Sequence, residues 1–449
     1  MKQLPLKHKG FKYLWTEDAF LTQRQAKYAL ERLWELTAGT AEWENGDNIE
    51  FTAVTKMQVD CMLNLPDKAM PWVPLTNVTP YATKFHFDTD CLPALCLSSS
   101  KVDPYFAGIG PFPLDLVAAT FILLTRWEEW ARPNLDHMGC YREDASLCAR
   151  QGFRDRPVLD EWAVVLRSWL ETKNYCWKAK LSKHRVWMSH DIDHLLYYKN
   201  PWRLVRGFIR DAIRQKSLYI AVCNAKKGIS AIVDPQKDPC MTAIVDLMNM
   251  DDALGERGTF FFMSAKASKF DEGYDLASEP GRSIVESIMR RGFEIGWHPS
   301  YFAAENDELF AAELASILRV TDQASVGVRH HFLRWQAGTS WKRMSDHGIP
   351  FDASVGYNGC LGFRASTAHF YPAYDLFGDA PLSLEVRPLI VMDGPLFSDS
   401  STAIKAVKTL MRRCEIVNGC FSVLIHNYTM MLNPKTRDTI LASFGNFIY

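Results

Sequence analysis

Residues 186–194 read Val-Trp-Met-Ser-His-Asp-Ile-Asp-His, a short apolar run that ends in a cluster of polar side chains. The run 186–189 has the composition of a buried β-strand, and Asp191 and Asp193 follow it directly. Two carboxylates at this spacing can share one site, in which one binds a divalent metal and the other stays free as a general base. The same Asp-x-Asp pattern also occurs as a turn or a helix cap, so both interpretations stay open at this point.

Further strand-like runs follow along the chain and alternate with amphipathic helical stretches. This alternation predicts parallel βαβ units of the α/β class, and about seven strands suit a closed or nearly closed barrel. The predicted strands are 186–189, 259–263, 293–297, 326–329, 351–355, 384–387 and 421–426. The predicted helices between them include 240–254, 282–291, 308–320 and 402–417.

The first part of the chain has a different texture, rich in Trp, Pro and Leu, with helices predicted near 21–36, 114–130 and 157–171. A chain of 449 residues is long enough for two domains. We place the boundary in the polar stretch 178–185, which predicts a smaller α+β domain over 1–180 and the barrel over 181–449. The basic, irregular stretch 197–238 is predicted to be an insertion outside the barrel core.

Charge and composition narrow the functional classes. The 51 basic and 52 acidic residues nearly cancel, so no global field favours nucleic acid or anionic membranes. No signal-peptide pattern opens the sequence, and the longest apolar run, 114–125, contains Asp115 and is shorter than the ~20 residues that span a bilayer. The 11 Cys are scattered without a CxxC pair, which fits reduced thiols. We therefore expect a cytoplasmic protein without a membrane span or nucleic-acid partner.

Three more predicted strands end in residues suited to acid, base or metal chemistry. His298 follows 293–297, Arg329 and His331 lie at the end of 326–329 or just beyond it, and His426 ends 421–426. In a parallel barrel these strand ends face a common pocket. Taken singly, such a histidine is more often a buried structural residue. The arginine could be a surface charge, but its place at a strand end favours a role in the site. Their coincidence at four strand ends favours one shared site.

The order of these motifs is specific. Asp-x-Asp is followed by Gly-Thr-Phe-Phe-Phe at 258–262, then by Glu-Ile-Gly-x-His, Arg-x-x-Phe and Leu-Ile-His. This order resembles the polysaccharide deacetylase family, of the carbohydrate esterase family 4 type, over residues 186–449. Within it the chain is similar to a bacterial branch with His-Asp-Ile-Asp-His and His-Pro-Ser-Tyr motifs, whose preceding, uncharacterised domain resembles residues 1–180. The resemblance implies a distorted (β/α)7 barrel and metal-dependent hydrolysis of an N-acetyl amide on a carbohydrate.

The resemblance also implies roles for individual residues. Asp191 becomes the general base and Asp193 a metal ligand. His298 becomes the first histidine ligand, Arg329 the partner that orients Asp191, and His426 the general acid. The implied cofactor is a divalent metal ion, with Zn²⁺ as first choice, and the implied partner is a carbohydrate substrate. The sequence gives no indication of the oligomeric state.

One family position departs from this pattern. A second histidine ligand is expected four residues after His298, but the chain has Phe302 there. A metal that activates water normally needs three protein ligands. His331 is the first candidate for the third, because in an extended chain it projects to the same side as Arg329; His194 is the second. The alternatives are a carbohydrate-binding barrel without catalysis, or a hydrolase of another non-peptide amide.

Overall fold

The computed structural model describes residues 4–44, 46–75, 87–98, 112–174, 176–198, 202, 204–205, 218–264, 268–397 and 400–432. The chain forms two compact units. Unit 1 comprises Met1–Val186, Leu333–Val391 and Ala406–Ser422, and unit 2 comprises Trp187–Phe332, Met392–Lys405 and Val423–Tyr449. Residues 199–201, 203 and 206–217 of the predicted insertion lie outside the described residues, whereas Leu218–Val233, expected to be irregular, forms a helix. The expected domain boundary near residue 180 stays a prediction.

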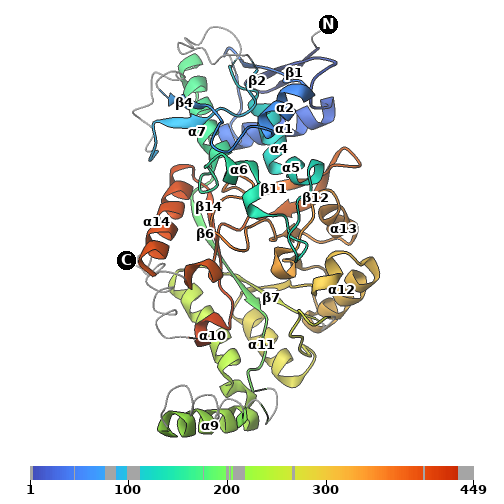
Figure 1. Ribbon diagram of the computed structural model, residues 1–449, viewed down its shortest axis with the longest axis vertical. Coiled ribbons are helices and arrows are strands. Elements are labelled where there is room, and N and C mark those ends of the chain that lie inside the picture. The colour runs from blue at the N-terminus through green and yellow to red at the C-terminus, as the bar shows by residue number, and fades with distance from the viewer. Residues whose placement is uncertain are drawn as a thin grey trace. The chain divides into compact units, whose positions relative to one another are not determined.

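The first 180 residues contain small sheets and several helices (Figure 1). β1 pairs antiparallel with β2, β2 pairs parallel with β3, and β4 pairs antiparallel with β5. The strands are β1 (Leu4–His8), β2 (Phe11–Trp15), β3 (Ile49–Thr52), β4 (Trp72–Pro74) and β5 (Cys91–Pro93). The helices are α1 (Gln23–Ala38), α2 (Lys56–Leu63), α4 (Leu116–Leu124), α5 (Trp127–Ala131), α6 (Leu147–Arg150) and α7 (Val158–Lys173).

Helix α1 begins at a capping box. The Thr22 side chain accepts a hydrogen bond from the backbone N–H of Gln25, and the Gln25 side chain accepts one from that of Thr22. The helix packs against α4 and α7, and its buried side, which includes Leu33 and Trp34, lies at helical spacing. Helix α4 is buried on every side and apolar throughout, apart from Thr120, so it forms the centre of this core.

A buried charge cluster joins parts of unit 1 that are far apart in sequence. Glu129 lies between two arginines: it accepts hydrogen bonds from Arg126 Nε at 2.9 Å and from Arg364 Nη2 at 2.6 Å. All three residues are almost fully buried. The two arginine charges outweigh the effect of burial and hold the pKa of Glu129 below its usual range. The carboxylate is therefore ionised and fully paired.

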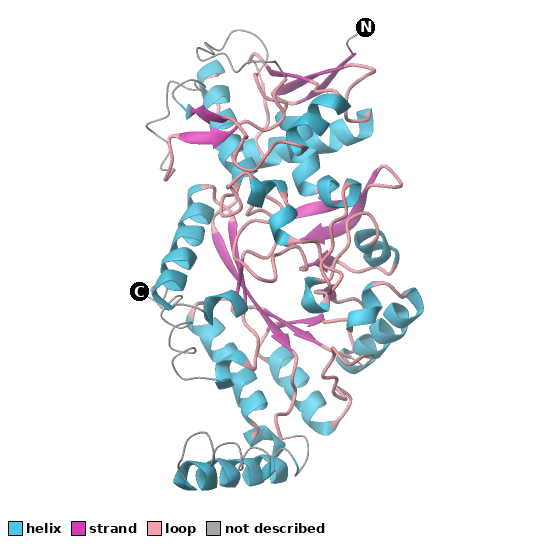
Figure 2. Cartoon of the chain, viewed as in Figure 1, coloured by secondary structure: helices cyan, strands magenta, loops and turns pink. Residues whose placement is uncertain are grey.

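The largest of the three sheets that the described residues form has nine strands in the order β11-β12-β10-β9-β8-β7-β6-β14-β13. Figure 2 draws the strands in magenta. Strands β6 to β9 are mutually parallel, β10 is parallel to β12, and β11 is antiparallel to β12. The bounds are β6 (Arg185–Ile192), β7 (Thr259–Phe262), β8 (Glu294–Trp297), β9 (Gly327–Val328), β10 (Phe351–Asp352), β11 (Tyr371–Asp375), β12 (Ala380–Val386), β13 (Val391–Met392) and β14 (Cys420–Leu424).

The predicted α/β class is confirmed, and each of the seven predicted strands overlaps a strand of this sheet. The order has two ends, β11 and β13, so the strands of the described residues form an open sheet and the expected closure into a barrel is not seen among them. Strands β11 and β13 were not predicted. β13 is only two residues long, and β11 is the antiparallel partner of β12 outside the alternating βα pattern.

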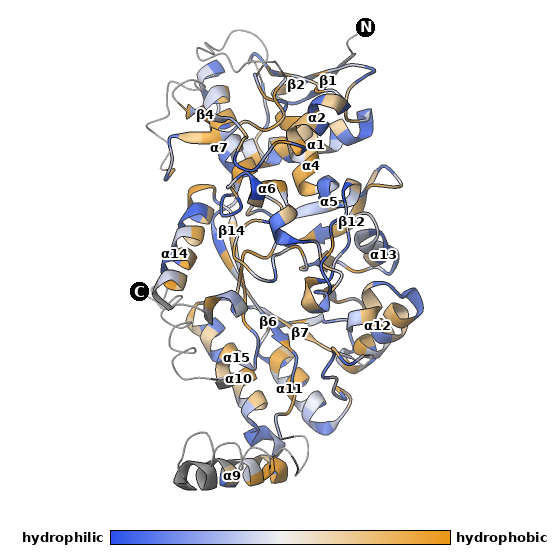
Figure 3. Cartoon of the chain, viewed as in Figure 1, coloured by the Kyte–Doolittle hydropathy of each residue, from blue (hydrophilic) through white to orange (hydrophobic). Residues whose placement is uncertain are grey.

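The helices predicted between these strands are present. Helix α11 shows why, since Ile284, Val285 and Ile288 are buried at helical spacing while polar residues face outward, and both kinds are visible in Figure 3. The helices are α9 (Leu218–Val233), α10 (Pro239–Ala253), α11 (Glu279–Arg290), α12 (Asp307–Thr321), α13 (Ser340–Asp346), α14 (Ser400–Ile416) and α15 (Thr429–Leu432). Within the described part of the chain, every helix is too short or too polar to cross a bilayer.

Asp115 provides a test of the unit 1 core. It is fully buried, and its carboxylate accepts hydrogen bonds from the Tyr13 hydroxyl, the Val54 N–H and the Ala118 N–H at the start of α4. Asp115→Ala removes a helix cap and leaves two buried donors unpaired, so we expect a loss of about 2–4 kcal/mol of stability. Thermal unfolding followed by circular dichroism measures this change. The exposed Asp67→Ala serves as control, with an expected change below about 0.5 kcal/mol; equal effects of both changes would contradict the assignment.

Candidate active site

The carboxyl ends of four parallel strands lie in one row. Ile192 of β6 is paired with Phe262 of β7, Phe262 with Trp297 of β8, and Trp297 with Val328 of β9. The residues that directly follow β6, β8 and β9 are Asp193, His298 and Arg329. The register therefore places three of the predicted site residues along the same edge of the sheet.

Asp191 and Arg329 form a buried ion pair. Arg329 Nη1 donates to Asp191 Oδ1 at 2.9 Å, and Nη2 donates to Ser189 Oγ at 2.9 Å. Both charged residues are at most 2% exposed, and the guanidinium lies over the Phe261 ring. Burial raises the pKa of Asp191, but the charges of Arg329, His298 and His426 outweigh it and hold this pKa below its usual range. Asp191 is therefore a carboxylate at neutral pH.

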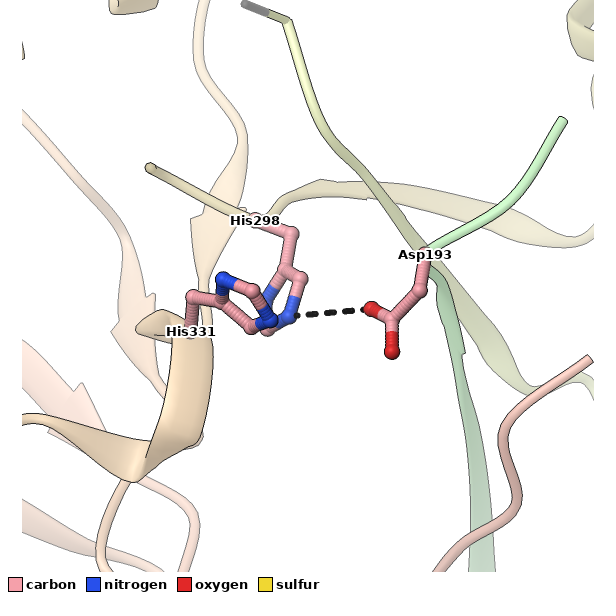
Figure 4. A group of neighbouring side chains, drawn as sticks. All are labelled: Asp193, His298 and His331. Atoms are coloured by element: carbon pink, nitrogen blue, oxygen red, sulfur yellow. Dashed lines mark ion pairs between the residues drawn. The ribbon is translucent and has the colours of Figure 1, made fainter. Parts of the chain in front are cut away.

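Asp193, His298 and His331 offer one ligand atom each, and these atoms lie within 4.8 Å of one another. Figure 4 shows the two imidazoles and the carboxylate gathered at one place. His298 Nε2 and Asp193 Oδ1 are 3.5 Å apart, close to the ~3.3 Å between two ligands of a tetrahedral ion bound at ~2.0–2.1 Å. Asp193 Oδ1 is buried without a hydrogen-bond partner, as expected of an atom that faces a cation. This donor set fits a divalent metal.

Hydrogen bonds orient both imidazoles. His298 Nδ1 lies 2.5 Å from the carbonyl oxygen of Arg329, and His331 Nδ1 lies 2.9 Å from Asp271 Oδ1. An acceptor at Nδ1 requires the proton there and leaves the Nε2 lone pair free for a metal. Burial lowers the pKa of His298 despite the opposing charges of Asp191 and Asp193. His298 is thus held in the neutral form that metal binding requires.

His426 has a different environment. Asp393 receives a hydrogen bond from the His426 backbone N–H at 2.9 Å, and its other oxygen lies 2.7 Å from His426 Nδ1. His426 Nε2 is 3.9 Å from Asp193 Oδ2, on the side of the metal group. Burial lowers the pKa of His426, but the charges of Asp393, Asp193 and Asp191 outweigh it and raise this pKa to about 10. The imidazole is therefore protonated on both nitrogens and positively charged at neutral pH.

The second candidate for the missing ligand, His194, and Phe302, which stands at the family's ligand position, are not part of the metal-binding group. His194 is partly exposed, with its Nδ1 3.9 Å from Glu272 Oε2 and its ring against the edge of Tyr428, and it is not part of the metal-binding group. Phe302 is 45% exposed. Of the alternatives weighed from the sequence, His331 is the one whose ring lies with Asp193 and His298.

Sequence reasoning missed two carboxylates. Asp393 directly follows β13, so an apolar run ending in Asp, Leu389-Ile-Val-Met-Asp393, was a usable signal. Asp271 lies in an irregular segment between β7 and α11, and no strand or motif marks it. Aromatic side chains also gather beside His331: Phe332 stacks on its ring, and Phe270 packs against Tyr301.

Comparisons with known proteins found a family model that matches part of the chain and a similar solved structure. Residues 28–175 match the model of a family of unknown function, DUF7033. No curated protein matches the chain. Among solved structures, a protein from Mycobacterium smegmatis that is provisionally assigned as a polysaccharide deacetylase is similar, with 14% identity and a TM-score of 0.38. The match covers 60% of this chain and 84% of that protein.

The three ligand residues can be tested by metal binding. His331→Ala, His298→Ala and Asp193→Ala each remove one of three donors, so we expect each variant to bind Zn²⁺ at least 10-fold more weakly than the unaltered protein. Competition with a chromophoric chelator measures these affinities. The exposed His137→Ala serves as control and should leave the affinity unchanged. Unchanged affinity in His331→Ala would show that the third ligand is a different group.

Proposed function

We propose that this protein is a metal-dependent hydrolase that removes the acetyl group from an N-acetylated carbohydrate or glycan intermediate. The observation that carries the proposal is the convergence of three arrangements at one sheet edge. These are a carboxylate paired with a buried arginine, an Asp-His-His group, and a charged histidine paired with a second carboxylate. A general base, a metal site and a general acid are the groups that metal-dependent hydrolysis of an amide uses.

Zn²⁺ is the proposed metal. Two imidazoles and one carboxylate form the ligand set of several catalytic zinc sites, which leave a fourth position open for water or substrate. When bound, such an ion lowers the pKa of water from 15.7 to about 7 and acts as a Lewis acid toward a carbonyl oxygen. The residues of this chain that would hold it are Asp193, His298 and His331.

Asp191 is the proposed general base. Its Oδ1 is occupied by Arg329, and its Oδ2 lies 3.7 Å from His298 Nε2, so this second oxygen is directed toward the metal group. The ionised carboxylate accepts the proton of the attacking water as the bond from water oxygen to carbonyl carbon forms. Arg329 keeps the carboxylate charged and fixes its orientation. An exposed aspartate would have no such fixed orientation.

His426 is the proposed general acid. When the bond between the carbonyl carbon and the amide nitrogen breaks, the departing amine needs a proton, and the protonated Nε2 of His426 can supply it. Asp393 accepts the Nδ1 hydrogen bond and stabilises the imidazolium. Acetate and the free amino sugar leave, and proton exchange with solvent returns Asp191 to the carboxylate and His426 to the imidazolium before the next cycle.

The carbohydrate class of the substrate is inferred from the motif order described above. Two features of the site are consistent with it. The Tyr428 ring lies 5.0 Å from the His426 ring, and Phe332 stacks on His331, so aromatic rings flank both the proposed acid and a proposed ligand. Aromatic faces suit the apolar faces of sugar rings.

Asp191→Asn and His426→Gln test the roles of base and acid. Both variants should retain Zn²⁺, because neither residue is a proposed ligand, and each should lower kcat by ~10²–10⁴-fold, the usual contribution of a positioned acid or base. The assay is acetate release from N-acetylglucosamine oligomers by the zinc-loaded protein. The exposed Asp246→Asn in α10 serves as control and should retain full activity.

Three results would contradict parts of this proposal. Loss of zinc from Asp191→Asn, to the same degree as from Asp193→Ala, would make Asp191 a ligand instead of a base. Zinc-loaded protein that binds the oligomers and releases no acetate would favour a carbohydrate-binding protein without catalysis. Zinc-loaded protein that neither binds nor hydrolyses them would exclude these oligomers and direct the search to other amides.

A further inference from the structure

Asp271 is a buried carboxylate with three hydrogen-bond partners. It is 2% exposed. Its Oδ2 accepts a hydrogen bond from Ser268 Oγ at 2.6 Å, and its Oδ1 accepts one from the Tyr301 backbone N–H at 2.9 Å. The third partner is His331 Nδ1, also 2.9 Å from Oδ1. A carboxylate held at both oxygens in this way has one orientation, and that orientation is directed at an imidazole.

The contact fixes the tautomer of His331. An ionised carboxylate only accepts hydrogen bonds, so His331 Nδ1 carries a proton, and in the neutral imidazole Nε2 then presents its lone pair. Asp271 accepts hydrogen bonds at both of its oxygens, from Ser268 at Oδ2 and from Tyr301 and His331 at Oδ1, which is the pattern of an ionised carboxylate. The carboxylate therefore stays charged beside the imidazole. A carboxylate behind a ligating histidine also makes the other ring nitrogen a stronger donor.

The two histidines of the metal group differ in this respect. His298 Nδ1 is held by a neutral backbone carbonyl, that of Arg329, whereas His331 Nδ1 is held by a charged side chain. The pairing of the strands fixes the position of that backbone carbonyl, because the Arg329 N–H donates a hydrogen bond to the Trp297 carbonyl, next to His298. His331 lies beyond the end of β9, where Phe332 and Leu333 both have positive φ, so the sheet does not orient it.

We propose that Asp271 is a positioning residue that makes His331 a metal ligand, and so supplies the donor that Phe302 cannot. This inference rests on the proposed function, since it assigns a role within the same metal site. Asp271 reaches His331 from the segment between β7 and α11, and its bond to the Tyr301 N–H ties that segment to the 3-10 turn Tyr301–Ala304 that contains Phe302. In place of the histidine expected at position 302, the chain then uses His331 together with the Asp271 carboxylate that orients it.

Asp271→Asn removes the negative charge of the side chain and keeps its shape. The amide oxygen can still accept hydrogen bonds from His331 and Tyr301, and the amide nitrogen can face Ser268, so the local fold is retained. We expect Zn²⁺ affinity to fall by ~10–100-fold, the usual effect of losing such a partner. Asp271→Ala should lower the affinity further, because the His331 ring then loses its orientation. Chelator competition measures both, and the visible spectrum of Co²⁺-loaded protein reports the ligand geometry.

A second measurement does not depend on metal. In the metal-free protein, ¹⁵N chemical shifts of the imidazole nitrogens identify the protonated one. We expect His331 to be protonated at Nδ1 in the unaltered chain, and to populate the Nε2-protonated tautomer as well in Asp271→Ala. Ser268→Ala is the matched control: it removes a hydrogen bond from the same carboxylate but leaves the His331 contact, so zinc affinity should stay within about threefold.

The outcomes separate this inference from the proposed function. Unchanged zinc affinity in folded Asp271→Asn and Asp271→Ala, or a His331 tautomer that does not respond to Asp271→Ala, would overturn the role of Asp271 while the metal site remains. Absence of zinc binding by the unaltered protein would overturn the proposed function and this inference together. Equal losses of zinc affinity in Ser268→Ala and Asp271→Asn would show that Asp271 only stabilises the fold of its own segment, and would overturn its role as a positioning residue.

Discussion

Arg329 carries a full positive charge at a position that water does not reach, and the geometry of the candidate site depends on how that charge is met. Its guanidinium donates a hydrogen bond to Asp191, and its backbone carbonyl oxygen accepts one from His298 Nδ1. Its backbone N–H donates to the Trp297 carbonyl, which pairs the end of β9 with the end of β8. Removing one partner of such a buried pair typically costs about 3–5 kcal/mol. The Asp191 carboxylate thus depends on the side-chain charge of Arg329, whereas the His298 contact and the pairing of β8 with β9 use the backbone of the same residue.

Three carboxylates around this centre show how environment separates chemically similar groups. Asp191 faces a guanidinium and stays charged, Asp271 faces a histidine that offers its other nitrogen to the site, and Asp393 faces a histidine that retains two protons. The imidazoles divide in the same way, since burial keeps His298 neutral whereas surrounding carboxylates raise the pKa of His426 to about 10. Neutral imidazoles are suited to metals and charged ones to proton donation.

Much of this arrangement is predictable from local sequence. Strand ends with Asp191, Asp193, His298 and His426 are readable because each follows an apolar run, and parallel strands bring such ends together. His331 was inferable from the two-residue alternation after Arg329, although the chain in fact leaves the extended conformation there.

Other features depend on tertiary contacts and left little or no sequence signal. Asp271 is a site residue only because its segment folds back onto His331. Whether seven or nine strands close into a barrel is decided by long-range pairing, which no short stretch encodes, and the described strands give an open order. Asp393 is different, because the apolar run 389–392 before it was a usable signal, although strand β13 within that run is only two residues long and was not predicted.

The discontinuity of unit 1 has a consequence for biosynthesis. Glu129 and Arg364, partners in its buried charge cluster, are separated by 235 residues, which a ribosome translates in roughly 10–50 s at ~5–20 residues per second. During that interval Glu129 has only Arg126 of its two arginines, and the Leu124 carbonyl lacks the Tyr371 hydroxyl that donates to it in the folded chain. The N-terminal part of this protein is therefore made first, but its buried charge cluster is completed only after Arg364 has been translated.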